Sequence, residues 1–135
     1  MHPVGGAFTI NTGDMAQIWS NGRYHAPEHR VLSDTQGERY SAPFFYNPSF
    51  ASVVAPLPQL GAPRYHECVW GYFRAQRFAG DFADYGQEIQ ISDFARVDGP
   101  PGWHVGNQQR FLREADFAQP FSVEGNRHLL ERRSP

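Results

Sequence analysis

The chain has 135 residues, a formal net charge of −2, and hydrophobic and aromatic contents of 40% and 15%. This length and composition suit one globular domain with a core and do not fit a disordered chain. The small net charge and the lack of a basic block argue against a nucleic-acid partner, and no apolar run approaches the roughly 20 residues that a membrane span needs.

The first part of the chain predicts two short elements that are followed by a tight turn. Residues 7–11 (AFTIN) favour a short strand, and residues 15–19 favour a short helical piece. The sequence Ser-Asn-Gly-Arg that follows is a strong turn signal, because asparagine and glycine both tolerate a left-handed backbone. We therefore expect Asn21 and Gly22 to have a structural role.

The next segment predicts a β-hairpin. Residues 28–32 (EHRVL) form the first expected strand, residues 33–38 (SDTQGE) supply the turn-forming residues of the loop, and residues 39–46 (RYSAPFFY) form the second strand. Pro43 cannot donate a hydrogen bond to a neighbouring strand, which favours an edge position for the second strand.

Beyond the hairpin we expect a loop and then short helices. Prolines and a glycine mark residues 56–63 as a surface loop, and residues 69–78 (VWGYFRAQRF) place apolar side chains at helical spacing. Residues 97–102 (VDGPPG) indicate a linker, and residues 108–117 favour a short helix. We assign no fold to residues 97–135 and expect this tail to be poorly ordered.

Cys68 is the single cysteine and has no partner for an internal disulfide. This suits a reducing compartment, and with no recognisable signal peptide we expect a cytoplasmic protein. A catalytic thiol is one interpretation of this residue. A cysteine in the sequence Tyr-His-Glu-Cys-Val-Trp more often packs in a core.

Three polar side chains of the hairpin form the candidate site. Arg39 and Ser41 are two residues apart, so both point to one face of the expected strand, where an arginine fork and a hydroxyl can bind a carboxylate. His29 lies on the preceding strand, at a spacing that would bring its imidazole into the same cavity. Each also has an ordinary interpretation: Arg-x-Ser is usually a solvated face, and a lone histidine is more often structural than a ligand.

Several strings in the first two-thirds of the chain resemble one family. Gly-Asp-Met, Ser-Asn-Gly-Arg-Tyr, Glu-His-Arg-Val and Arg-x-Ser-x-Pro-Phe-Phe occur in the order and spacing of the C-terminal part of Fe(II)- and 2-oxoglutarate-dependent dioxygenases of the isopenicillin N synthase-like family. The resemblance implies a mainly β fold with short helices, namely part of a double-stranded β-helix (jelly roll), over residues 1–96.

The resemblance also implies cofactors and roles. His29 would be the distal metal-binding histidine, and Arg39 and Ser41 would hold the far carboxylate of 2-oxoglutarate beside Fe(II). Members of the family use these cofactors and oxygen to hydroxylate, desaturate or cyclise a small-molecule substrate. We assign no catalytic residue beyond these binding residues.

The other half of such an iron site, a His-x-Asp or His-x-Glu pair, is not found in the sequence. We therefore interpret the chain as a C-terminal fragment, a truncated gene product or a degenerate relative, and we expect a partner chain to cover the exposed sheet edge. Three hypotheses stay open: an oxygenase by ancestry, a catalytically inactive jelly-roll interaction module, and a dicarboxylate binder without redox chemistry.

Overall fold

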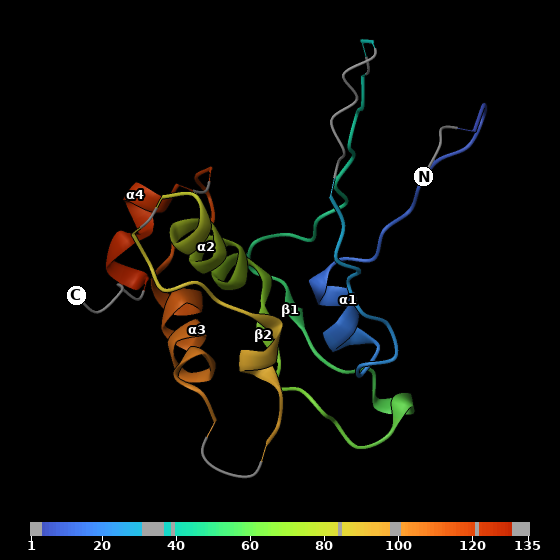
Figure 1. The fold of residues 1–135 in the computed structure, drawn as a ribbon. Helices are drawn as coiled ribbons and strands as arrows, with labels where there is room; N and C mark the ends of the chain where they lie inside the picture. The colour runs from blue at the N-terminus through green and yellow to red at the C-terminus, as the bar shows by residue number, and fades with distance from the viewer. Residues whose placement is uncertain are drawn as a thin grey trace.

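Helices surround a very small sheet in the described part of the chain. The computed structural model describes residues 4–30, 37–38, 40–83, 85–97, 101–120 and 122–130. The elements are α1 (Asp14–Trp19), β1 (Val53–Val54), η1 (Pro58–Leu60), β2 (Cys68–Val69), α2 (Trp70–Asp81), η2 (Ile91–Phe94), α3 (Trp103–Glu114), α4 (Val123–Asn126) and η3 (Arg127–Leu129). Figure 1 shows α2, α3 and α4 gathered on one side of the strands and α1 on the other.

The sheet has two antiparallel strands, with Val53 opposite Val69 and Val54 opposite Cys68. A side chain of α3 covers the other edge of β2. The Gln108 amide accepts a hydrogen bond from the Val69 backbone N–H at 2.9 Å, and it donates one to the carbonyl oxygen of Glu67 at 2.8 Å. Gln108 is fully buried, so its amide supplies the hydrogen bonds that a neighbouring strand would otherwise make.

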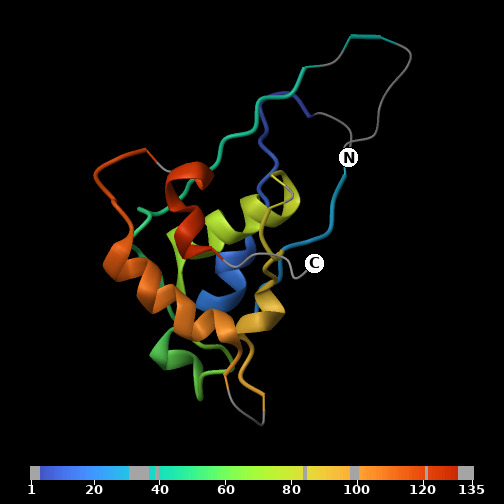
Figure 2. The same ribbon diagram turned by 90° about the vertical axis from the view of Figure 1, so that its left-hand side faces the viewer.

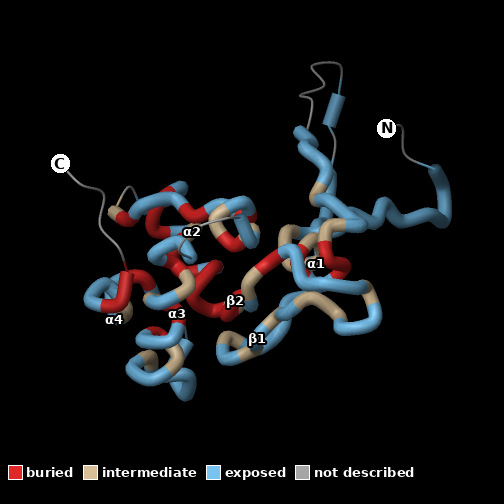
Figure 3. The backbone as a smooth tube through the Cα atoms, turned by 90° about the horizontal axis from the view of Figure 1, so that it is seen from below, coloured by how far each residue is buried: buried red, intermediate tan, exposed pale blue. Residues whose placement is uncertain are grey.

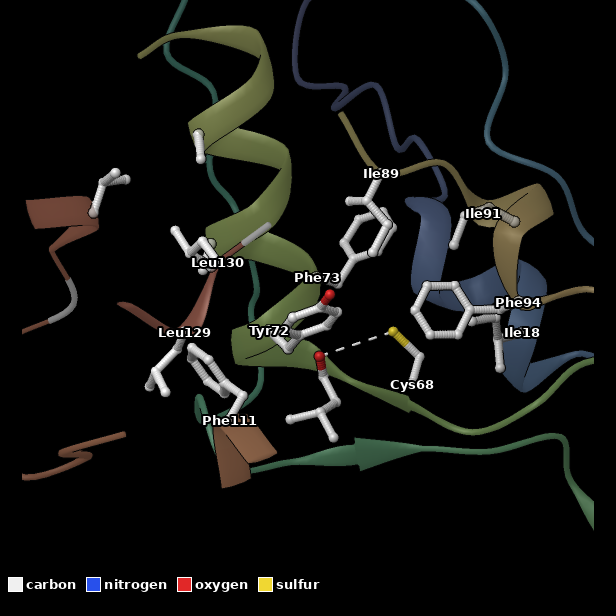
Figure 4. Close-up of a cluster of buried hydrophobic side chains, with 14 of the residues drawn as sticks. Ile18, Cys68, Tyr72, Phe73, Ile89, Ile91, Phe94, Phe111, Leu129 and Leu130 are labelled. Atoms are coloured by element: carbon white, nitrogen blue, oxygen red, sulfur yellow. Dashed lines mark hydrogen bonds between the residues drawn. The ribbon is translucent and has the colours of Figure 1, made fainter. Parts of the chain in front are cut away.

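The central helix, α2, confirms the helix predicted from residues 69–78, and it runs on to Asp81. Its buried residues recur every three or four positions, which is the spacing of one helix face. They pack against side chains from every neighbouring element, and Figure 4 shows Tyr72, Phe73, Phe94 and Phe111 meeting in this core. The fully or almost fully buried apolar residues are Ile18, Cys68, Val69, Tyr72, Phe73, Ala75, Ala79, Ile89, Phe94, Phe111 and Leu129.

Cys68 lies inside this core, as the packing interpretation predicted. Its thiol approaches only the carbonyl oxygen of Val69, at 3.8 Å. Burial, together with the nearby charge of Asp14, raises the pKa of the Cys68 thiol far above its usual value. The thiol therefore stays protonated, and a nucleophilic role is disfavoured because only the thiolate is reactive.

The turn after α1 confirms the structural role predicted for Asn21 and Gly22. Both residues adopt a left-handed backbone, with φ values of 54° and 82°. The Asn21 side chain donates to the carbonyl oxygens of Leu60 and Ala62 at 3.3 and 2.9 Å, and it accepts from the N–H of Arg64 at 2.8 Å. One buried amide therefore fixes the loop around η1 to the end of α1.

The expected hairpin strands are not seen in the described residues. Residues 4–13, 23–30 and 40–49 have extended or irregular backbone without strand pairing. The two limbs of the hairpin segment overlap in Figure 1, but the perpendicular view in Figure 2 separates them widely. A strand needs hydrogen-bonded neighbours and a buried face, and the described residues supply neither for the predicted hairpin. The described part of the chain therefore has the expected short helices but does not form a jelly roll.

Two helices come from the part of the sequence that was left without an assigned fold. Residues 101–120 and 122–130 contain α3, α4 and η3, and these pack on α2 and β2. α3 begins five residues before the predicted helix at residues 108–117. The sequence pattern is weak because two of the three buried residues of α3, His104 and Gln108, are polar.

Candidate functional site

His29 lies in an exposed, extended segment that follows the Asn21 turn. Its ring nitrogen Nδ1 is 2.9 Å from the carbonyl oxygen of Pro27. A carbonyl oxygen can only accept, so Nδ1 carries the proton and Nε2 keeps a free lone pair. Metal-binding histidines commonly donate one ring N–H to a backbone carbonyl in this way and bind the metal through the other nitrogen.

Ser41 is exposed in the other limb of the segment. Its partner in the predicted carboxylate clamp, Arg39, lies outside the described residues, as do residues 31–36 of the predicted hairpin. Within the described part of the chain, no hydrogen bond joins Ser41 to His29, and the limbs that carry them are apart in Figure 2. The structure therefore presents these side chains separately.

A complete metal site is not formed by the described residues. No group of three His, Cys, Asp or Glu side chains among them is arranged to hold a metal ion. An Fe(II) centre with open positions typically takes two histidines and one carboxylate. The described residues therefore do not form such a centre by themselves, and no reaction step at iron follows from them.

The N-terminal segment and the limb that carries Ser41 expose a set of large apolar side chains. Phe8, Ile10, Tyr40, Phe44, Phe45 and Tyr46, here called the exposed apolar set, are between 75% and 95% exposed. Figure 3 shows the contrast between these pale limbs and the buried centre. Isolated apolar residues are normal on a surface, but so many exposed on two short segments are unusual for a folded protein in water.

A buried polar cluster lies elsewhere, at the start of α3. His104 Nε2 is 3.3 Å from Asp93 Oδ2, and His104 Nδ1 is 3.3 Å from the Tyr72 hydroxyl. A pocket of about 250 Å³ opens beside the pair and is also lined by His66. No motif in the sequence indicates this cluster, because its residues come from three different elements.

Sequence comparisons place the segment that carries the candidate site in a class of oxygen-using enzymes. Residues 1–48, which include His29, Arg39 and Ser41, match the family model of the 2OG-Fe(II) oxygenase superfamily. This match confirms the resemblance to Fe(II)- and 2-oxoglutarate-dependent oxygenases seen in the sequence. The cofactors of the superfamily are Fe(II) and 2-oxoglutarate.

The curated relatives are hydroxylases and dioxygenases. Feruloyl CoA ortho-hydroxylase 1 of Arabidopsis thaliana is 52% identical over 58 residues, which are 43% of this chain and 16% of that protein. Scopoletin 8-hydroxylase of the same plant is 40% identical over 101 residues, covering 71% of this chain and 27% of the relative. Gibberellin 2-beta-dioxygenase 2, also from Arabidopsis thaliana, is 34% identical over 87 residues, covering 62% and 26%.

The chain therefore spans less than a third of the length of each of these three relatives. No solved structure matches it. Among the described residues, none of the helices has the length and apolar character required to cross a membrane.

Proposed function

We propose that this chain supplies one iron ligand and the cosubstrate clamp of a 2-oxoglutarate-dependent oxygenase whose remaining ligands lie on another stretch of polypeptide. The observation that carries the proposal is the hydrogen bond from His29 Nδ1 to Pro27, which leaves Nε2 available for a metal. The superfamily match over the same residues supports it.

The cosubstrate clamp consists of Arg39 and Ser41. In the proposed site the guanidinium of Arg39 makes two parallel hydrogen bonds to the far carboxylate of 2-oxoglutarate, and the Ser41 hydroxyl donates a third. Ser41 is exposed in this structure. Water competes with such bonds at an open surface, so the clamp needs a cover that excludes solvent.

The exposed apolar set identifies where that cover binds. Side chains alternate along an extended chain, so Tyr40, Phe44 and Tyr46 face away from Ser41. A second layer of strands against the apolar face would remove each of these side chains from water, at about 1.5–3 kcal/mol per side chain. We propose that this layer is the remaining part of an oxygenase jelly roll, in the same or another polypeptide, which also carries the missing His-x-Asp or His-x-Glu pair.

The reaction class follows from the relatives. Their names describe hydroxylation of feruloyl CoA and scopoletin, and dioxygenation of a gibberellin. We propose oxidation of a small organic molecule by O2, coupled to decarboxylation of 2-oxoglutarate to succinate and CO2. The residues that would select the substrate are not assigned in this chain.

A chimaera tests the role of His29. Residues 4–49 of this chain would replace the matching segment of the Arabidopsis thaliana scopoletin 8-hydroxylase, and succinate production from 2-oxoglutarate would be measured. We expect His29→Ala to abolish turnover because it removes a metal ligand. The matched control is His25→Ala, which changes another exposed histidine of the same segment and should retain turnover. Equal turnover with and without the His29 imidazole would refute the proposal.

The whole chain alone is expected to bind Fe(II) weakly and to produce no succinate. One imidazole cannot hold Fe(II) against water and competing chelators, and the described residues supply no complete ligand group. Anaerobic calorimetry with Fe(II), followed by a succinate assay, checks this. Tight binding at a one-to-one ratio would show a complete site within the chain and would contradict the need for a second polypeptide.

A further inference from the structure

His104 connects three elements through one buried imidazole. It lies in the first turn of α3, and its side chain is only 3% exposed. Its Nε2 donates to Asp93 of η2, whose Oδ2 also accepts from the backbone N–H of Gln90 at 2.8 Å. Its Nδ1 accepts from the hydroxyl of Tyr72 on α2. Both ring nitrogens are therefore used, and in the neutral imidazole one nitrogen donates and the other accepts.

We propose that the His104 bridge is a pH-sensitive clasp that holds α3 against α2 and η2 at neutral pH and releases α3 on acidification. A second proton on the ring has to go to Nδ1, which now accepts from Tyr72. The Tyr72 hydroxyl, 3.3 Å away, would then have to turn its proton away from the ring and accept from Nδ1–H instead of donating to Nδ1. The new positive charge would also lie among the rings of Tyr72 and Phe94.

The charges around His104 do not offset the effect of burial on the pKa of its imidazole. The titratable groups that face it are Tyr72 on α2, Asp93 on η2 and His66, which lines the same pocket from the segment before β2. Asp93 alone of the described lining residues carries a formal charge at neutral pH. Burial lowers the pKa of His104 to about 4 from the usual 6.5, against the opposing effect of the Asp93 carboxylate.

Acid should act on α3 before the rest of the core. The contacts that hold α2 to the segment before η2 contain no histidine: Arg77 donates to the carbonyl oxygen of Ile89 at 2.7 Å, and Gln76 donates to that of Gln87 at 2.7 Å. The other described contacts of α3 with α2 and β2 include the neutral Gln108 amide and the Phe111 ring. Release would uncover the edge of β2 that Gln108 now occupies.

The direction and size of the pH effect on the release of α3 follow from proton linkage. The released state has an ordinary histidine and binds more protons than the held state between pH 6.5 and 4. The equilibrium constant for release should therefore rise about 10-fold for each pH unit lost in this window, or roughly 300-fold in total. Above this window it should be independent of pH.

Hydrogen exchange of the full chain tests the clasp. After correction for intrinsic rates, the opening constant of residues 103–114 should rise roughly 30-fold between pH 7.5 and pH 5, while that of α2 should not change. His104→Gln keeps a donor and an acceptor but does not titrate, so it should remove the response. The matched control, His66→Gln, changes the other histidine of the pocket and should keep it.

Three outcomes would overturn the clasp: α2 and α3 opening together, a pH response that survives in His104→Gln, or an α3 that stays protected in acid. Should His104→Gln fail to fold, NMR titration of the unsubstituted chain decides. An imidazole that titrates well below 6.5, with loss of α3 protection in parallel, supports the proposal. One that titrates at its ordinary value while α3 remains protected refutes it.

Discussion

Alanine in place of Gly80 is expected to destabilise the chain by about 1–3 kcal/mol or more, because α2 meets backbone there. A β-carbon at this position would lie 2.5 Å from the Cα of Glu88 and 2.7 Å from its backbone nitrogen. Backbone atoms cannot turn away as a flexible side chain can. The segment after α2 would have to move, and it carries Ile89, which is fully buried. Urea unfolding followed by tryptophan fluorescence measures the change.

Gly106→Ala is the matched control. Gly106 is also inside a helix, α3, but no atom lies within 4 Å of where its β-carbon would be. Alanine lowers the backbone entropy of the unfolded chain, so this variant should gain about 0.5–1 kcal/mol. The same substitution in two helices should thus have opposite signs. A stabilised Gly80→Ala variant would show that the chain does not pack closely at the end of α2.

Short sequence patterns were sufficient to predict the elements whose conformation depends mainly on residues close in the chain. The Asn21-Gly22 turn follows from two residues that tolerate positive φ, and α2 follows from the spacing of its apolar side chains. The core position of Cys68 was also predicted from its neighbours. For the candidate site, the role of His29 stays a prediction from the sequence, and its bond to the Pro27 carbonyl is seen only in the folded chain.

The parts that could not be predicted depend on distant residues. Tyr40 and Phe44 have strand-like sequence, yet a strand forms only beside a partner, and none is present among the described residues. β1 and β2 are two residues each, below what periodicity can detect. α3 is held by His104 and Gln108, whose polar side chains give no apolar pattern and whose partners lie far away in the sequence.

Serine in place of Phe44, Phe45 and Tyr46 is expected to abolish self-association of the chain without changing its stability. These side chains are mostly in water, so the free energy of unfolding should stay within about 0.5 kcal/mol. Burying each against another molecule is favourable by about 1.5–3 kcal/mol, which drives association of the unsubstituted chain. Sedimentation velocity would measure association, and urea unfolding would measure stability.

Phe82→Ser provides the matched control, because Phe82 is exposed at the end of α2, outside the limbs that carry the exposed apolar set. It should leave association unchanged. Equal loss of association in Phe82→Ser would mean that contacts between copies are not specific to the limbs. A monomeric unsubstituted chain would show that the exposed apolar set does not drive self-association.

The triple serine variant should have the opposite effect inside the chimaera with scopoletin 8-hydroxylase. There the same three side chains would lie between two layers of strands, and polar replacement would leave the layers poorly packed and the carboxylate clamp open to water. Succinate production by the chimaera should fall, although the same substitutions should stop self-association of the isolated chain. Opposite signs in the two settings are expected only if another layer of the oxygenase fold covers these residues. Full turnover of the triple variant would exclude them from that interface.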